Sequence, residues 1–255
     1  MAASDRRGDP LLARASPGGW AAWLRALGER GDADLAAFGL TLAVGFAAGL
    51  LALYLFAALA YEVMRQQTDL LDLGVLAWLQ QFKSPALDAL AWAVSLMGSQ
   101  AVAVLVVVLG VVYALRGRWG AAVGLVLVTG GAQLLNDVLK GEFHRVRPAP
   151  VLGMIPVQAF SFPSGHAMVS AAFYGFLAYL SWRVLRGWWR TASTLALLAL
   201  VLAIGLSRLY LGVHYLTDVL AGYLAGFVWA DTVILGSRLL ARRRAPPPPP
   251  DRVAG

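Results

Sequence analysis

His214 and Asp218 are four residues apart at the start of a long apolar run, so they share one face of the helix that this run predicts. An aspartate that accepts the Nδ1–H of an imidazole leaves the Nε2 lone pair free. A histidine held in this way can act as a nucleophile or as a base. We therefore expect His214 and Asp218 to form a catalytic pair.

A second histidine, His166, follows Pro163-Ser164-Gly165 at the mouth of another apolar run. The start of a helix offers free backbone N–H groups and the positive end of the helix dipole, and both favour an anion. Gly165 has no Cβ to block a close approach. We expect Ser164 and Gly165 to bind an anionic group, with His166 beside it.

Three basic residues lie just beyond the ends of two other apolar runs: Lys140 and Arg147 follow the run 119–139, and Arg208 follows the run 191–206. Ionisable groups at the ends of membrane spans are functional by default when they face the interior of a bundle. The guanidinium fork of arginine matches phosphate oxygens. These residues are therefore predicted to bind phosphate.

Three cations, two histidines and a helix start together suit phosphoryl transfer, which depends on positioning and on charge stabilisation. We expect His214 to attack phosphorus and form a phosphohistidine, and His166 to protonate the leaving oxygen. Asp218 is committed to His214, so no cluster of carboxylates remains for Mg²⁺. We expect neither a metal nor a cofactor.

The elements that must position these residues are apolar helices. The chain has 255 residues, of which 59% are hydrophobic and 14% charged, against about 25% charged in soluble domains. Spanning a bilayer takes roughly 20 apolar residues. Six runs meet or approach that length: 38–61, 101–115 with a start after Leu87, 119–139, 166–182, 191–206 and 215–235. We expect an all-α, six-transmembrane-helix bundle, with the segment 69–82 as an interfacial helix.

The net charge of +7 orients the bundle and does not indicate a nucleic-acid partner. Short loops rich in Lys and Arg stay cytoplasmic. Most of the basic residues fall inside if both termini are cytoplasmic, because they cluster in 6–30, 116–118, 183–190 and 238–252. The predicted site residues then lie on the extracytoplasmic face.

The same composition suggests three parts of the chain. Residues 1–36 read as a cytoplasmic segment with an interfacial helix anchored by Trp20 and Trp23, residues 37–240 as the membrane domain, and residues 241–255 as a basic, proline-rich cytoplasmic tail. Cysteine is absent, which excludes disulfides, thiolate metal sites and a cysteine nucleophile.

Three motifs resemble those of the type 2 phosphatidic acid phosphatase (PAP2) superfamily of membrane phosphatases. They are K-x6-R-P at 140–148, P-S-G-H at 163–166 and S-R-x5-H-x3-D at 207–218. The resemblance implies a six-helix fold in the bacterial cytoplasmic membrane and metal-independent hydrolysis of lipid phosphates. It also implies that His214 is the nucleophile and His166 the general acid.

Several alternatives remain open at this level. The substrate could be undecaprenyl pyrophosphate, phosphatidylglycerol phosphate or phosphatidic acid, and the oligomeric state cannot be read from one sequence. A phosphotransferase would use the same intermediate, and a transporter would bind the lipid phosphate without cleaving it. Arg145 is a candidate for a further contact to a diphosphate or headgroup, and Asn136 and Asp137 are candidates for orienting Lys140.

Overall fold

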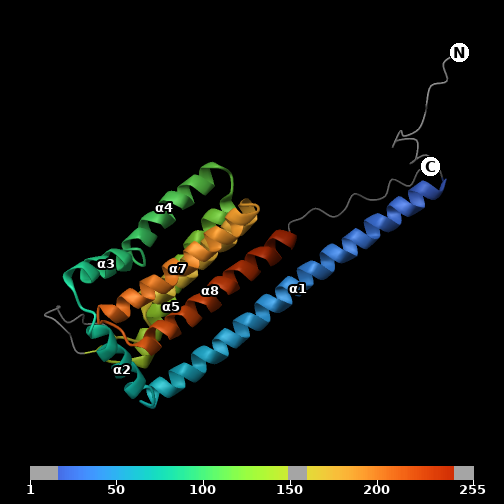
Figure 1. Cartoon of the computed structure of the whole chain (residues 1–255). Helices are drawn as coiled ribbons and strands as arrows, with labels where there is room; N and C mark the ends of the chain where they lie inside the picture. Colours follow the sequence, from blue (N-terminus) through green and yellow to red (C-terminus); the bar gives the residue numbers. More distant parts are fainter. Residues whose placement is uncertain (1–16, 149–159, 244–255) are drawn as a thin grey trace. The chain divides into compact units, whose positions relative to one another are not determined.

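The computed structural model describes residues 17–148 and 160–243 as a set of helices without strands, as the all-α prediction requires (Figure 1). The helices are α1 (Pro17–Met64), α2 (Asp69–Gln80), α3 (Pro85–Leu96), α4 (Gln100–Leu115), α5 (Trp119–Phe143), α6 (Gly165–Val184), α7 (Trp188–Tyr210) and α8 (Leu216–Arg243). The proline-rich tail from residue 244 lies outside the described residues, as do the side chains of Trp20 and Trp23 in the predicted interfacial helix.

The chain divides into two units within α1. Residues up to Phe46 form one unit, and residues from Ala47 onward form the other, which contains α2 to α8 and all the predicted site residues. The helix α1 is continuous through the boundary expected near residue 36. The three-part division of the chain stays a prediction.

Among the described residues, five helical stretches are long and apolar enough to cross a membrane: Leu35–Met64, Pro85–Leu115, Trp119–Phe143, Trp188–Tyr210 and Leu216–Arg242. The sixth predicted span corresponds to α6, whose 20 residues extend over roughly 30 Å at 1.5 Å per residue. That length matches the hydrocarbon core of a bilayer. Helices α5, α7 and α8 surround α6, so its surface is largely covered by protein.

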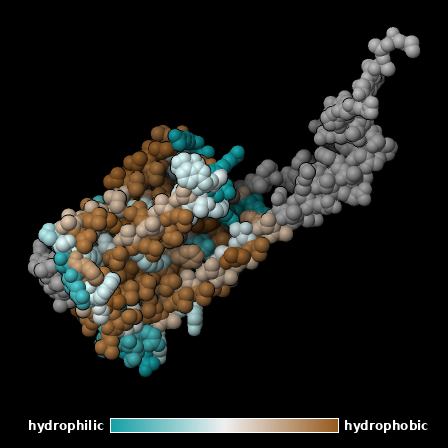
Figure 2. Space-filling view, in the orientation of Figure 1, coloured by the Kyte–Doolittle hydropathy of each residue, from teal (hydrophilic) through white to brown (hydrophobic). Residues whose placement is uncertain are grey.

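The face of the bundle seen in Figure 2 is largely apolar, with separate polar patches. Large side chains such as Val107, Val111 and Leu195 are exposed, by 64%, 53% and 59%. Extended apolar surface is unfavourable in water and suits contact with lipid. The surface therefore supports membrane embedding independently of helix length.

The second predicted span is broken in the structure. A turn at 97–99 separates α3 from α4, although the sequence is apolar on both sides of it. Gly98 lies against α7 in this turn, where a Cβ would come 2.6 Å from Ile204 Cγ2. By contrast, α2 has 12 residues, too few to span, as predicted, and its interfacial position stays a prediction.

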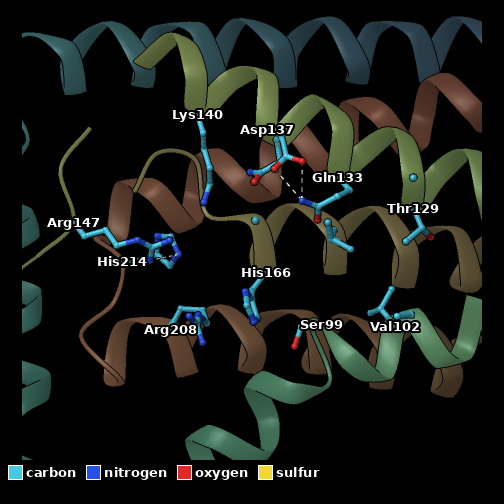
Figure 3. Close-up of a pocket in the computed structure, with 16 residues that line it drawn as sticks. Ser99, Val102, Thr129, Gln133, Asp137, Lys140, Arg147, His166, Arg208 and His214 are labelled. Carbon is cyan, nitrogen blue, oxygen red and sulfur yellow. Dashed lines mark hydrogen bonds between the residues drawn. The ribbon is translucent and has the colours of Figure 1, made fainter. Parts of the chain in front are cut away.

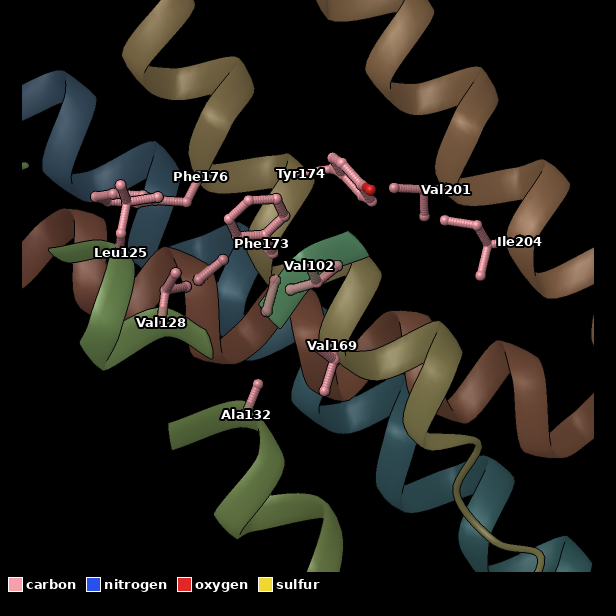
Figure 4. Close-up of a cluster of buried hydrophobic side chains, with 12 residues drawn as sticks. Val102, Leu125, Val128, Ala132, Val169, Phe173, Tyr174, Phe176, Val201 and Ile204 are labelled. Carbon is pink, nitrogen blue, oxygen red and sulfur yellow. The ribbon is translucent and has the colours of Figure 1, made fainter. Parts of the chain in front are cut away.

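Helices α6 and α8 pack closely through glycine. A Cβ on Gly222 would lie 2.6 Å from the carbonyl oxygen of Ser164, and one on Gly226 would lie 2.3 Å from that of Met168. Small residues spaced by four allow helix backbones to approach in this way. The contact fixes the start of α6 against α8, and a core centred on Phe173 and Phe176 continues the packing (Figure 4).

Candidate active site

One cavity of about 570 Å³ gathers most of the predicted site residues (Figure 3). Its walls come from α4, α5, α6 and α7, from the segment after α5, and from the loop between α7 and α8. Six of the predicted residues line it: Lys140, Arg147, Gly165, His166, Arg208 and His214. Three motifs separated in the chain therefore meet at one place.

His214 lies in the loop that precedes α8 and is 1% exposed. Its Nδ1 is 3.5 Å from Oδ2 of Asp218, and its Nε2 is 3.2 Å from Nη1 of Arg147. The same Nη1 donates to the carbonyl oxygen of Val213 at 2.8 Å, which holds the guanidinium beside the imidazole. Burial lowers the pKa of His214 to about 4, although Asp218 acts in the opposite direction. The neutral imidazole is the form that can attack an electrophile.

Asp218 is fully buried behind His214, in the first turn of α8. Its Oδ2 accepts hydrogen bonds from the Ser161 hydroxyl and, at 2.9 Å, from the Tyr215 amide. Its Oδ1 accepts from Nη1 of Arg145 at 2.7 Å. A carboxylate with this many donors is held ionised and in one orientation.

The start of α6 faces the cavity through Gly165 and His166. The Ser164 amide already donates to the carbonyl oxygen of Asp218 at 2.9 Å, and Ser164 itself is completely buried. The next amides, at 165–167, have no acceptor within the helix. Ser164 therefore lies beneath the cavity, and the amides of the following turn are the ones available to an anion.

Lys140 and Arg208 extend from α5 and α7 towards the space beside His166 and His214 (Figure 3). Nη1 of Arg208 donates to Oγ of Ser95 at 2.5 Å. Its Nε is buried and has no hydrogen-bond partner among the described residues. A buried donor without an acceptor is unfavourable, so this guanidinium is suited to an anionic ligand.

Two neighbours of Lys140 on α5, Asn136 and Asp137, have hydrogen-bond partners of their own. Asn136 donates to the carbonyl oxygen of Pro163 at 3.2 Å and so supports the segment before α6. Asp137 accepts from the Gln133 amide at 3.0 and 3.2 Å. Asn136 is engaged elsewhere, whereas the Asp137 carboxylate also interacts electrostatically with Lys140, so a role in orienting Lys140 stays a prediction.

The guanidinium of Arg145 is held by other side chains of the protein, and its contact to a diphosphate or headgroup stays a prediction. Its guanidinium donates to Asp218 at 2.7 Å, to Thr217 Oγ1 at 2.8 Å and to Asp72 at 2.8 Å. It does not line the cavity. Sequence reasoning did not assign a role to Asp72, Ser161 or Thr217, and the available signal was the pair of acidic residues, Asp69 and Asp72, in the first turn of the apolar helix α2.

The described parts of the chain contain no group of three or more histidine and acidic side chains that could hold a metal ion. The charge facing the cavity is mainly positive, from Lys140, Arg147 and Arg208. Such a site attracts an anion and can stabilise charge that develops on it.

The helical fold, the cavity and the three motifs together define a class of protein. Residues 121–239 match the family model of the PAP2 superfamily. The resemblance drawn from the motifs is thereby confirmed.

Individual relatives extend the comparison. The chain is 39% identical over 129 residues to phosphatidylglycerophosphatase B of Bacillus subtilis, an alignment that covers 49% of this chain and 62% of the relative. A crystal structure of a transmembrane PAP2 type phosphatidylglycerolphosphate phosphatase from Bacillus subtilis superimposes with a TM-score of 0.68 and 28% identity, covering 77% of this chain and 97% of that one. The structure of Aquifex aeolicus LpxE matches in fold, with a TM-score of 0.52, 22% identity, and coverage of 64% of this chain and 94% of that one.

Proposed function

We propose that this protein is a membrane phosphatase that removes phosphate from a lipid through a phosphohistidine on His214. The observation that carries the proposal is the meeting of His166, His214 and three cations around one cavity of about 570 Å³. An apolar outer surface would let a lipid reach the site from the bilayer.

The chemistry follows from the positions of the side chains. The Nε2 lone pair of His214 attacks phosphorus as the bond to the lipid oxygen breaks, and His166 in its protonated form gives its proton to that oxygen. Water then attacks phosphorus, His166 takes the proton of this water, and the phosphorus–nitrogen bond breaks. Free phosphate leaves and both histidines return to their initial states.

The cations stabilise the transferring group throughout. Phosphoryl transfer spreads negative charge over the equatorial oxygens of phosphorus. Arg147, Arg208 and Lys140 supply positive charge around the cavity, and the first amides of α6 add N–H donors. This arrangement does not call on a divalent metal, so we expect turnover to be metal-independent.

Phosphatidylglycerol phosphate is the substrate that we propose first. The 39% identical relative from Bacillus subtilis carries the name phosphatidylglycerophosphatase B. Phosphatidic acid and undecaprenyl pyrophosphate share the phosphate group and a long apolar tail, and they are the competing substrates.

Phosphate release from the purified full chain in detergent tests the proposal. With EDTA present, the wild-type protein is expected to hydrolyse phosphatidylglycerol phosphate with a higher kcat/KM than phosphatidic acid or undecaprenyl pyrophosphate. His214→Ala should lose turnover while keeping its elution volume on size exclusion.

Each departure from these results has a defined meaning. Turnover retained by His214→Ala would remove the nucleophile. Binding of lipid phosphate without release of phosphate would identify a transporter. Transfer of labelled phosphate to another lipid would identify a phosphotransferase.

A further inference from the structure

We propose that Asp72 and Arg145 are positioning residues for the Asp218–His214 pair, with Asp72 acting through Arg145 and Thr217. The inference rests on the proposed function of His214. Neither residue belongs to the three motifs, and both lie outside the cavity that holds the phosphate-binding side chains.

The two carboxylate oxygens of Asp218 have different hydrogen-bond partners. Its Oδ2 takes the hydrogen bonds of Ser161 and Tyr215 and lies 3.5 Å from Nδ1 of His214. Its Oδ1 is bound by Nη1 of Arg145 at 2.7 Å. Because Arg145 holds the far oxygen, it sets the rotation of the carboxylate and so the direction in which Oδ2 meets the imidazole.

Arg145 is itself held in place by other side chains. Its Nη2 donates to Oδ2 of Asp72 at 2.8 Å, and Nη1 also donates to Oγ1 of Thr217 at 2.8 Å. The guanidinium stacks over the Tyr215 ring, with Cζ 4.2 Å from the ring centre. A planar fork with fixed donors can bridge two carboxylates in this way, whereas a lysine ammonium is a point charge on a flexible stem.

Asp72 is 0% exposed, and both of its carboxylate oxygens accept hydrogen bonds. Oδ1 accepts from the Thr217 amide at 3.0 Å, and Oδ2 accepts from the Thr217 hydroxyl at 2.6 Å as well as from Arg145. Thr217 immediately precedes Asp218 in the first turn of α8. Asp72 therefore fixes both the guanidinium that binds Asp218 and the backbone that carries it.

These contacts suggest a structural role for α2, which is too short to span the membrane. The helix brings a buried carboxylate to the start of α8, where Arg145 forms ion pairs with both Asp72 and Asp218. Buried ion pairs stabilise only when their geometry is tightly satisfied, and breaking one leaves an uncompensated charge. The network is thus suited to holding one arrangement of the catalytic pair.

The test is the kinetics of Asp72→Asn and Arg145→Lys in the full chain. Each variant is expected to lower kcat by about 100-fold, the loss that a small misplacement of reacting groups can cause. KM and the inhibition constant for orthovanadate should stay at wild-type values, because the phosphate-binding residues are untouched. The double variant should be no slower than the slower single variant, because both act through one network.

Two further measurements separate positioning from general loss of structure. Asp88→Asn removes an ion pair of 3.3 Å with Lys83 away from the cavity, and it should leave kcat unchanged. Thermal unfolding reports the fold of every variant, and if Asp72→Asn does not fold, Arg145→Lys, which keeps the positive charge, decides the question.

The outcomes for the two proposals are distinct. A wild-type protein that releases no phosphate refutes the proposed function. An active wild type with Asp72→Asn and Arg145→Lys at full kcat refutes the positioning role alone. A raised KM or weaker vanadate inhibition with unchanged kcat would also overturn it, because these residues would then act in binding.

Discussion

Burial and the neighbouring carboxylate act in opposite directions on the pKa of His214. The side chain is 1% exposed, with a carboxylate at Nδ1 and a guanidinium at Nε2. The carboxylate favours a charged imidazole, whereas burial and the guanidinium disfavour it, and the balance lowers its pKa to about 4. His214 is therefore neutral across the physiological range, which is the state that a nucleophile requires.

This balance predicts an unusually low acid limb in the pH profile. Since kcat/KM reports groups of the free enzyme, the limb due to His214 should lie near pH 4, well below the ordinary imidazole value of about 6.5. Measuring kcat/KM from pH 3.5 to 8 on a phosphomonoester and on a pyrophosphate separates enzyme from substrate, because a limb that shifts with the substrate belongs to the substrate. A substrate-independent limb at 6.5 would contradict the burial argument.

Stability should follow the same group. A histidine whose pKa is lowered on folding binds its proton more readily in the unfolded chain. Its contribution to stability is therefore complete above pH 6.5 and is lost as the pH falls from 6.5 to about 4. The melting temperature of wild-type protein should drop through this window, and that of His214→Gln should drop less.

Among the helices, α6 is the one on which the site is built. Its first turn lines the cavity, Gly222 and Gly226 of α8 let its backbone approach closely, and Asn136 of α5 binds the segment just before it. The runs that form α5, α7 and α8 could be predicted from length and hydropathy. The break between α3 and α4 was not predicted, because a single Gly-Ser pair within a long apolar run is a weak turn signal, and the close contact of Gly98 with Ile204 of α7 appears only in the fold.

A glycine pair on α6 tests the packing at its start. In Gly165→Ala the new Cβ would lie 2.8 Å from Oδ1 of Asn136, which cannot move without giving up its bond to Pro163. Such overpacking costs about 1–3 kcal/mol, and it would also displace the amides predicted to bind phosphate. We expect a lower melting temperature and a lower kcat.

Gly175→Ala is the matched control, since a Cβ there meets nothing within 4 Å. Alanine is favoured over glycine within a helix by up to about 1 kcal/mol, so this variant should be as stable as wild type or more stable. Equal melting temperatures and equal kcat for the two variants would show that the start of α6 tolerates a side chain.

For the unit from Ala47 onward, the sequence predicts the site residues and the sidedness, and the structure adds contacts between distant residues. The three motifs could be found from the sequence because each is confined to a short segment with its own spacing. The Asp72–Arg145 contact joins residues 73 positions apart and leaves no local pattern, so only the fold reveals it. The sidedness of the bundle is the opposite case, because the distribution of arginine in the sequence is what predicts it.

The chain itself provides a test of that sidedness, because it contains no cysteine and a single introduced thiol has no background. Gln67 is exposed between α1 and α2, at the end of the bundle that carries the cavity. Gly120 is exposed at the start of α5. The 25 residues of this helix extend over roughly 37 Å at 1.5 Å per residue, so Gly120 lies at the opposite end. Neither change alters the charge that orients the helices, and a Cβ at position 120 meets nothing within 4 Å. Because the arginine-rich loops are retained in the cytoplasm, Gln67→Cys should react with a membrane-impermeant maleimide in intact cells, and Gly120→Cys only after permeabilisation. The reverse pattern would put the cavity on the cytoplasmic side, and its lipid substrates would then have to come from the inner leaflet.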